Sequence, residues 1–282
     1  MILVFGKTGQ VARELAILPD VHCLGRENAD LSTPNACADM IVKLRPRAVI
    51  NAAAYTAVDK AEDEEPLATT INGKAPGAMA LACAELGIPL VQISTDYVFA
   101  GGGEIPWQPD APTGPLGAYG RSKLLGEELV RAAGGCHAVL RTSWVVSAHG
   151  NNFVKTMLRL GVDRDALTIV ADQIGGPTGA REIAKACHSI ATQLIADSGK
   201  SGTYHFSGAP DCSWADFARA IFDLADLKCD VIDIPSCDYP TPATRPLNSR
   251  MDCRGTLTQF GIQRPEWLAT LNHILTDLGA LS

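Results

Sequence analysis

The chain has 282 residues, 46% hydrophobic and 20% charged, with a formal net charge of -7. This length allows one large domain, or one domain with a smaller lobe. The acidic balance argues against nucleic acid as a partner, because phosphate contacts need clustered Lys and Arg. The sequence has neither a run of roughly 18–20 apolar residues nor a basic leader, so we expect a cytoplasmic protein without a membrane partner.

Cysteine and histidine give no sign of a metal site. The nine cysteines never occur as C-x-x-C, and the six histidines form no H-x-x-x-H pair. We therefore expect reduced thiols and no bound metal ion.

The first half of the chain alternates short apolar runs with helical patterns. Strands are predicted at residues 2–5, 21–25, 48–51, 90–94 and 138–143. Helices are predicted at 10–18, from Pro34 onward, and at 68–86 and 117–133. This alternation predicts an α/β fold, a Rossmann-type doubly wound parallel sheet with helices on both faces.

Strand candidates become sparse after Trp144, at 167–170 and 203–206, whereas helices continue at 181–195, 214–224 and 267–278. A Pro-rich loop spans 235–246. We assign residues 1–145 to a dinucleotide-binding domain and residues 146–282 mainly to a smaller α/β substrate-binding lobe. Parts of 146–180 and 230–250 are candidates to return to the first domain.

The segment from Gly6 to Ala12 has the pattern of a phosphate-binding loop between the first strand and first helix. Gly6 allows a tight turn, Gly9 lets the backbone approach a diphosphate, and Ala12 lets the helix pack on the strand. A plain strand-to-helix turn is the alternative. A nucleotide-triphosphate P-loop is excluded, because Met1 stands where its first glycine belongs.

The end of the second strand bears on the choice of cofactor. Arg26 lies where an acidic residue usually binds the ribose of NAD, and a guanidinium suits a 2′-phosphate. This favours NADPH over NADH, unless Arg26 is only a solvated loop residue. Asp30 and Leu31 are placed to lie along the adenine. The small residues that follow the third strand, including Ala54, leave room for the cofactor.

Tyr119 and Lys123 are the strongest candidates for catalysis. Residues four apart share a helix face, and a nearby ammonium lowers the pKa of a phenol. We expect Tyr119 to donate a proton to a developing alkoxide. The pair is common in isolation and gains weight from the glycine loop and from Thr95. Thr95 ends the fourth strand, where its hydroxyl can bond a substrate carbonyl.

Further candidates lie around the predicted cleft. Trp144 follows the fifth strand and either stacks on a sugar or packs under the second lobe. Asn152 and Arg245 are weaker candidates for substrate diphosphate or nucleoside contacts. Tyr97 and Trp107 are interpreted as packing residues.

Together these motifs resemble the dTDP-4-dehydrorhamnose reductases, a family of the extended short-chain dehydrogenase/reductase superfamily. The resemblance runs the length of the chain and includes residues 6–12, 51–59, 94–99, 119–123, 141–144, 150–153, 172–173, 177–179 and 245–249. It implies reduction of the 4-keto group of dTDP-4-dehydro-L-rhamnose by NADPH or NADH, a step toward bacterial cell-surface polysaccharide.

The resemblance also implies residue roles. Tyr119 would be the general acid, Lys123 its tuner and the ribose anchor, and Thr95 the hydroxyl on the carbonyl. The substrate would contact Thr95, Asp96 and Trp144. The cofactor would be lined by Gly9, Gln10, Val11, Asp30, Leu31, Ala54, Tyr55 and Thr56.

One departure from the family concerns magnesium. Some members are described as dimers bridged by Mg²⁺ through carboxylates. Glu14 remains at one such place, but Arg181 and Leu268 stand where the others align. Neither side chain offers the oxygen that Mg²⁺ requires. We therefore expect a monomer or weak homodimer in which a role for Mg²⁺ is doubtful.

Two alternatives stay open. A related sugar-nucleotide reductase, 4,6-dehydratase or epimerase has the same scaffold, but a dehydratase needs Asp-Glu after the Thr and this chain has Asp96-Tyr97. The other is a non-catalytic regulatory subunit of the methionine adenosyltransferase type. The intact set of Thr95, Tyr119 and Lys123 argues against it.

Overall fold

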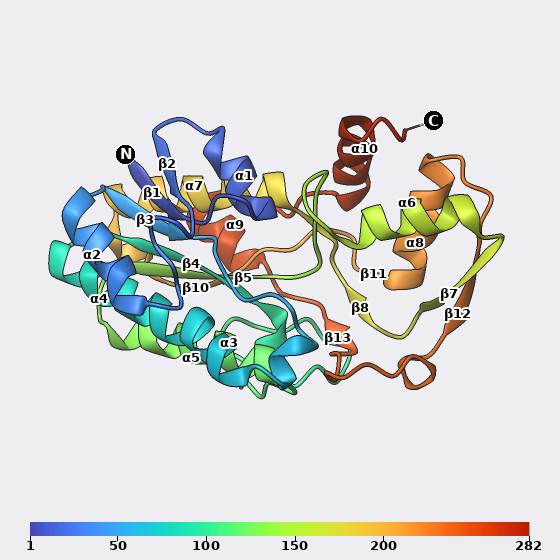
Figure 1. Cartoon of the computed structure of the whole chain (residues 1–282), viewed down its shortest axis with the longest axis horizontal. Helices are drawn as coiled ribbons and strands as arrows, with labels where there is room; N and C mark the ends of the chain where they lie inside the picture. The colour runs from blue at the N-terminus through green and yellow to red at the C-terminus, as the bar shows by residue number, and fades with distance from the viewer. Residues whose placement is uncertain (282) are drawn as a thin grey trace.

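A six-stranded sheet forms the centre of the computed structural model, which describes residues 1–281 (Figure 1). Its strand order is β10-β5-β4-β3-β1-β2, and every neighbouring pair is parallel. The strands are β1 (Ile2–Phe5), β2 (Val21–Leu24), β3 (Ala48–Asn51), β4 (Leu90–Thr95), β5 (His137–Thr142) and β10 (Gly202–His205). The order reverses between β1 and β3, which is where such sheets bind ligands. The predicted fold class is confirmed.

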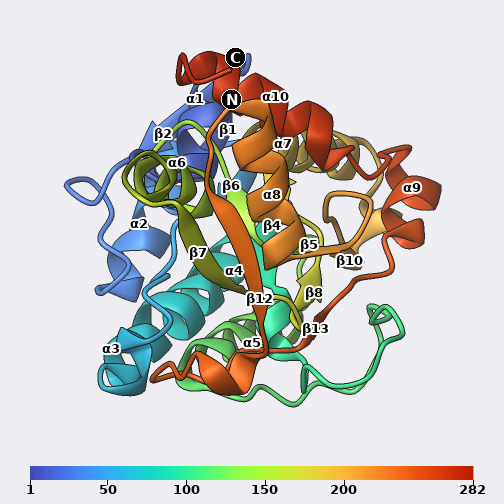
Figure 2. The same ribbon diagram turned by 90° about the vertical axis from the view of Figure 1, so that its right-hand side faces the viewer.

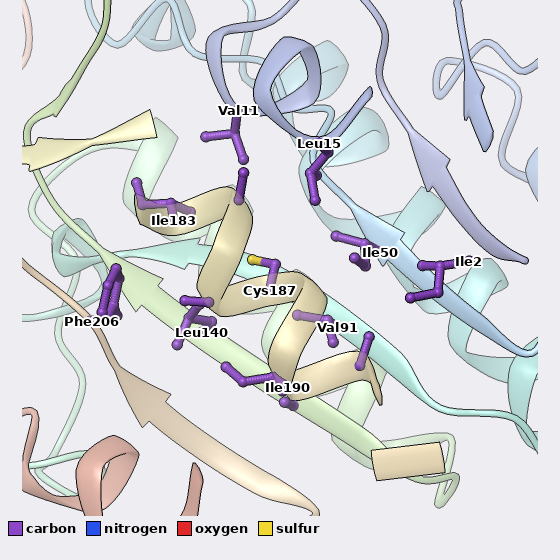
Figure 3. Packing of buried hydrophobic residues seen from close by; sticks show 14 of the residues in the cluster. Ile2, Val11, Leu15, Ile50, Val91, Leu140, Ile183, Cys187, Ile190 and Phe206 are labelled. Atoms are coloured by element: carbon purple, nitrogen blue, oxygen red, sulfur yellow. The ribbon is translucent and has the colours of Figure 1, made fainter. Parts of the chain in front are cut away.

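Alternating residues of the strands feed two hydrophobic layers. In β1, Ile2 and Val4 face the layer of α1 (Gln10–Ala16) and α7 (Ala180–Ala196), whereas Leu3 and Phe5 face that of α2 (Pro34–Leu44) and α4 (Ala75–Leu86). Figure 3 shows α7 crossing the sheet with Ile183, Cys187 and Ile190 among the side chains of the strands. Within residues 1–281, no helix is long and apolar enough to cross a membrane.

The helix predicted at 68–86 is longer and less regular than expected. It begins as α3 (Glu65–Thr69), passes through a π-helical segment at Thr70–Lys74, and continues as α4. Next to it lies α5 (Ala118–Ala132). A Cβ at Gly126 would collide with the carbonyl oxygen of Asn72, so a glycine is needed where α5 meets the π-helical segment.

The second lobe has its own core beyond one end of the sheet (Figures 1 and 2). Its elements are α6 (Phe153–Asp163), β7 (Ala166–Val170), α8 (Trp214–Leu224), β12 (Asp230–Ile234) and α10 (Trp267–Asp277). The core is rich in aromatic rings, and Phe217 contacts both Phe153 and Trp267. The sequence analysis predicted neither α6 nor β12. Five two-residue strands pair outside the main sheet, in the orders β6-β9 and β11-β8-β13. They are β6 (Val145–Val146), β8 (Ile174–Gly175), β9 (Thr178–Gly179), β11 (Cys212–Ser213) and β13 (Asn248–Ser249).

The path of the chain after residue 180 corrects the sequence analysis, which placed the strand at 203–206 and the helix at 181–195 in the C-terminal lobe. β10 pairs with β5 in the main sheet, and α7 covers that sheet. Residues from β10 and from α9 (Arg254–Phe260) lie in the same hydrophobic layer. The reason is burial, because the apolar face of α7 packs on the strands and Tyr204 and Phe206 extend that layer.

Candidate active site

The predicted site segments meet at one edge of the sheet because its strands are parallel. The carboxyl ends of β1, β3, β4 and β5 lead into the loops at Gly6, Ala54, Thr95 and Trp144. The second lobe lies beyond this edge (Figure 1). The arrangement leaves the site between a rigid sheet and a separate aromatic core.

The glycine loop has a backbone that fits a diphosphate. Gly6 has a φ of 117°, and a Cβ there would lie 3.3 Å from both Ala12 Cβ and the carbonyl carbon of Ala52. Gly9 is the N-cap of α1. Among the described residues no side chain caps this helix, and nothing lies within 4 Å of a Cβ built at Gly9. No side chain therefore occupies the capping position of this helix, which leaves it available to an anion.

Gln10 and Asn152 hold each other across the two lobes. The Gln10 side-chain oxygen accepts hydrogen bonds from Ser147 Oγ at 2.8 Å and Asn152 Nδ2 at 3.0 Å. Asn152 also caps α6, since its oxygen accepts from the Lys155 amide. This contact set makes Asn152 a structural link, and its substrate contact stays a prediction. Val11 lies in the core, so only its backbone is available to a cofactor.

The residues predicted for the adenosine end lie along the surface after β2. Arg26 is 74% exposed, and its guanidinium lies 3.3 Å from the Asp30 carboxylate. The pKa of Asp30 is lowered mainly by the hydrogen bond from the Ser32 amide, with a further contribution from Arg26. Leu31 is buried. Arg26 is thus positioned at the correct strand end, and its contact with a 2′-phosphate stays a prediction.

The loop after β3 is fixed from behind by Asn72. The Asn72 side chain accepts from the Tyr55 amide at 2.8 Å and donates to the Tyr55 carbonyl at 3.0 Å. It also donates to Ser122 Oγ on α5. Ala54 and Thr56 on either side of Tyr55 are exposed. The loop predicted to bind the cofactor is therefore tied to the helix that carries Tyr119.

Tyr119 and Lys123 lie one turn apart on α5, and Thr95 ends β4, the strand on which this helix packs. Tyr119 lies in the first turn of α5, and its phenol lies close enough to the Thr95 side chain for that group to lower the Tyr119 pKa slightly. Lys123, one turn later, is 4% exposed and donates from Nζ to the Ile93 carbonyl at 2.6 Å. Glu62 supplies the missing cap of this helix by accepting from the Ala118 amide at 2.9 Å.

The expected direction of the Tyr119 pKa is wrong. Burial raises this pKa, and the negative charge of Asp96 raises it further, against the smaller opposite effect of the Thr95 side chain. The physical reason is that Lys123 Nζ is bonded to a backbone carbonyl, while its own pKa is lowered to about 8 by burial. Tyr119 therefore holds its proton at neutral pH, as a general acid must.

Asp96 is a buried carboxyl group bonded to hydroxyls. It is 2% exposed, accepts from Ser249 Oγ and accepts from Thr95 Oγ1 at 3.0 Å. Burial raises its pKa to about 6, despite those hydrogen bonds. In this structure Asp96 orients Thr95, and a direct contact with substrate stays a prediction.

Trp144 is strained and half-covered. It has a φ of 48°, which is uncommon for a bulky residue, and its ring stacks on Trp214 with centroids 3.6 Å apart and planes 10° apart. One face of Trp144 therefore belongs to the second lobe. Trp107, in contrast, stacks on Phe99 and is the packing residue expected.

Arg245 brings the Pro-rich loop to the site. One of its Nη atoms lies 2.7 Å from Asp59 Oδ2, and the positive charge of the guanidinium acts to lower the pKa of Tyr97 against the larger effect of burial. The other Nη atom is buried without a hydrogen-bond partner among the described residues. Tyr97 meets the Tyr119 ring edge-on, with centroids 5.5 Å apart. Tyr97 thus packs against Tyr119, as its interpretation as a packing residue predicted.

Comparison with known proteins identifies the family. Residues 1–280 match the family model described as RmlD substrate binding domain. The dTDP-4-dehydrorhamnose reductase of Sinorhizobium fredii is 44% identical and that of Salmonella typhimurium 40%, each over 98% of this chain and 97% of the relative. The chain belongs to the dTDP-4-dehydrorhamnose reductase family. The resemblance stated from the motifs is confirmed.

Solved structures of the family have the same fold. The dTDP-4-dehydrorhamnose reductase of Clostridium acetobutylicum has a TM-score of 0.91 at 35% identity and covers 99% of both chains. That of Bacillus anthracis in complex with NADP has a TM-score of 0.90 at 34% identity and covers 98% of both. UDP-glucose 4-epimerase from Brucella ovis, at 16% identity and a TM-score of 0.81, shares the fold alone.

The surroundings of Glu14 differ from a carboxylate metal site. Glu14 is buried, and its oxygens lie 3.2 Å from His149 Nε2 and 3.4 Å from Arg181 Nε. Arg181 also pairs with Asp277 on α10 at 2.9 Å. Within residues 1–281, no group of three or more His, Cys, Asp or Glu residues has an arrangement that suits a metal ion. In this member of the dTDP-4-dehydrorhamnose reductase family, the cation beside Glu14 is therefore the guanidinium of Arg181.

Sequence reasoning missed the residues that hold the site from behind. Asn72 and Glu62 contact site residues from distant segments, and no short motif marks them. Glu127 had a usable signal, since it follows Lys123 by four residues on the same helix. A carboxylate on the buried face of a helix needs a charged or hydrogen-bonding partner. This requirement alone predicts a buried cationic side chain near Glu127.

Proposed function

We propose that this chain reduces the 4-keto group of dTDP-4-dehydro-L-rhamnose to give dTDP-L-rhamnose, with NADPH or NADH as the reductant. The names of its relatives support this activity, as does the NADP complex of the Bacillus anthracis protein. The observation that carries the proposal is the position of Thr95 at the end of β4 and of Tyr119 and Lys123 one turn apart on the adjoining α5, at the same sheet edge as the glycine loop.

The chemistry follows from these three side chains. The hydroxyls of Thr95 and Tyr119 would bind the substrate carbonyl oxygen, and Tyr119 would donate its proton as negative charge develops there. Lys123 would bind ribose hydroxyls and offset negative charge near the phenol. The nicotinamide, when bound, supplies the hydride. In this structure the Thr95 hydroxyl donates its one proton to Asp96, so binding of the carbonyl oxygen would replace that hydrogen bond.

The binding residues are divided between the lobes. Arg26 favours NADPH as the preferred cofactor. The cofactor residues we propose are Gly6, Gly9, Gln10, Val11, Arg26, Asp30, Leu31, Ala54, Tyr55, Thr56, Tyr119 and Lys123. The substrate residues are Thr95, Asp96, Trp144, Asn152 and Arg245. We further propose a cytoplasmic enzyme that works as a monomer or weak homodimer without Mg²⁺.

The test is oxidation of NADPH, and of NADH in parallel, in the presence of the keto-sugar nucleotide. Tyr119→Phe removes the proton donor and is expected to lower kcat by about 10²–10⁴-fold. Tyr204→Phe is the matched control, because Tyr204 lies on β10 and its hydroxyl donates to the Lys200 carbonyl, outside the proposed site. Unchanged turnover in Tyr119→Phe would remove Tyr119 as the acid. No turnover by the intact protein would favour a non-catalytic regulatory subunit.

A further inference from the structure

A completely buried carboxylate lies directly behind the proposed catalytic residues. Glu127 is 0% exposed and follows Lys123 by one turn of α5. One of its oxygens accepts from Ser94 Oγ at 2.6 Å and from Arg141 Nε at 2.9 Å. The other accepts from Arg141 Nη2 at 2.7 Å and from Arg131 Nη1 at 3.1 Å. All of these donors point at a single anion.

The cation of this pair is as well enclosed as the anion. Arg141 is 2% exposed, donates from Nη1 to the Pro109 carbonyl at 3.0 Å, and lies over the Phe99 ring. A buried ion pair of this kind adds little net stability compared with well-packed apolar residues, because both ions lose their hydration. Stability alone therefore does not account for charges in this position.

Two members of the network, Ser94 and Glu127, lie next to proposed active-site residues. Ser94 precedes Thr95 on β4 and pairs in register with Arg141 on β5. Glu127 shares its helix face with Lys123 and, one further turn back, with Tyr119. Through hydrogen bonds, the carboxylate connects α5 to both strands whose ends carry the site. A change in its length or charge is therefore transmitted to the relative positions of Thr95 and Lys123.

We propose that Glu127 is a positioning residue for the reduction, which fixes α5 against β4 and β5 and, with Arg141, sets the electrostatic surroundings of Lys123. This inference rests on the proposed function for its kinetic readout only. Burial lowers the pKa of Lys123 and the charge of Glu127 raises it. The charged and titratable groups near this face are Tyr119, Glu127 and Arg131 on α5, Asp96 after β4, Arg141 on β5 and His205 on β10.

The decisive variant is Glu127→Gln, which keeps the shape and leaves Arg141 as an unbalanced cation. We expect Lys123 to lose its proton at lower pH, so the alkaline limb of the kcat/KM profile moves down by about one pH unit. At a pH above that limb, kcat/KM is then expected to fall about tenfold. The double variant Glu127→Gln/Arg141→Met removes both charges, and its limb is expected to return toward that of the wild type. A merely structural role predicts an unmoved limb and a double variant worse than the single one.

A second readout does not depend on the proposed function. NMR of protein labelled at the lysine ε-carbon follows the titration of Lys123 without substrate or cofactor, with Lys123→Arg to assign the signal. Glu128→Gln, an exposed neighbour on the same helix, is the matched control and is expected to leave the titration unchanged. If wild-type turnover is absent, the proposed function fails while this titration still tests Glu127.

Folding failure of Glu127→Gln would not end the test. Glu127→Asp keeps a partner for Arg141 but moves the charge away from Lys123, so a smaller shift in the same direction is expected. A Lys123 titration that coincides with the wild type in every folded variant would overturn the proposal.

Discussion

Two buried glutamates on helices beside the site, Glu127 on α5 and Glu14 on α1, pair with arginine in different ways. Arg141 bonds Glu127 through two nitrogens at 2.7 Å and 2.9 Å and is sealed from solvent. Arg181 reaches Glu14 through one nitrogen at 3.4 Å, and its side chain is 38% exposed. The Glu127–Arg141 pair is therefore an enclosed link between a helix and the strands. The Glu14–Arg181 pair is a link between helices that solvent screens.

The largest difference between these pairs should appear on removal of each cation. Arg141→Met leaves the buried Glu127 with only the partly exposed Arg131 as a cationic partner, and we expect a loss of up to about 3–5 kcal/mol in the free energy of unfolding. Arg181→Met leaves Glu14 near His149 and solvent, with an expected loss of about 0–1 kcal/mol. Urea unfolding of both variants measures the comparison. Equal losses would show that the enclosure of Glu127 has no energetic consequence.

The free energy of unfolding should also depend on pH through His205, which lies beside Arg141 of the Glu127 pair. Burial, and then the charge of Arg141, lowers the pKa of His205 to about 3. An unfolded chain protonates this group near its ordinary pKa of about 6.5, so the unfolded state binds more protons between these values. The contribution of neutral, buried His205 to the free energy of unfolding is fully present above about pH 6.5. It declines as pH falls toward 3, by up to about 1.4 kcal/mol per pH unit.

The variant His205→Gln isolates this effect. The Nε2 atom of His205 lies 3.4 Å from Arg141 Nη1, and its Nδ1 lacks a hydrogen-bond partner within residues 1–281. A glutamine removes the titration, so the difference in unfolding free energy between wild type and variant should shrink as pH falls from 6.5 toward 3. Carboxylates that titrate in both proteins cancel in that difference. A difference that stays constant over this range would contradict the assignment.

The same comparison explains what the sequence could predict. Strands, the glycine loop and the Tyr119–Lys123 pair were predicted because each depends on spacing within one short segment. The partner of Glu127 was not, because Arg141 meets it only after β5 pairs with β4. The return of α7 and β10 to the sheet was missed for a related reason. Their apolar faces fit either layer, and only the completed sheet determines which face they cover.

Local sequence also fails where the surroundings decide the chemistry. A lysine four residues after Tyr119 predicted a lowered phenol pKa. The structure instead directs Lys123 to the Ile93 carbonyl and buries the phenol. Trp144 was placed correctly at the strand end, but its stacking on Trp214 depends on α8, which begins 70 residues later in a different lobe. Orientation and desolvation are properties of the assembled fold.

The smallest expected effect is that of EDTA on assembly and stability, because Arg181 already pairs with Glu14. The guanidinium of Arg181 already neutralises Glu14, and Leu268 offers no oxygen ligand on α10. We therefore expect the molar mass from light scattering and the melting temperature to be the same with Mg²⁺ and with EDTA. Arg181→Gln removes the cation and serves as the comparison, because it leaves the carboxylate free to attract a divalent ion. An EDTA-sensitive dimer of the wild type would show that oxygen donors outside this pair hold a metal, and that the Glu14–Arg181 contact does not decide the assembly.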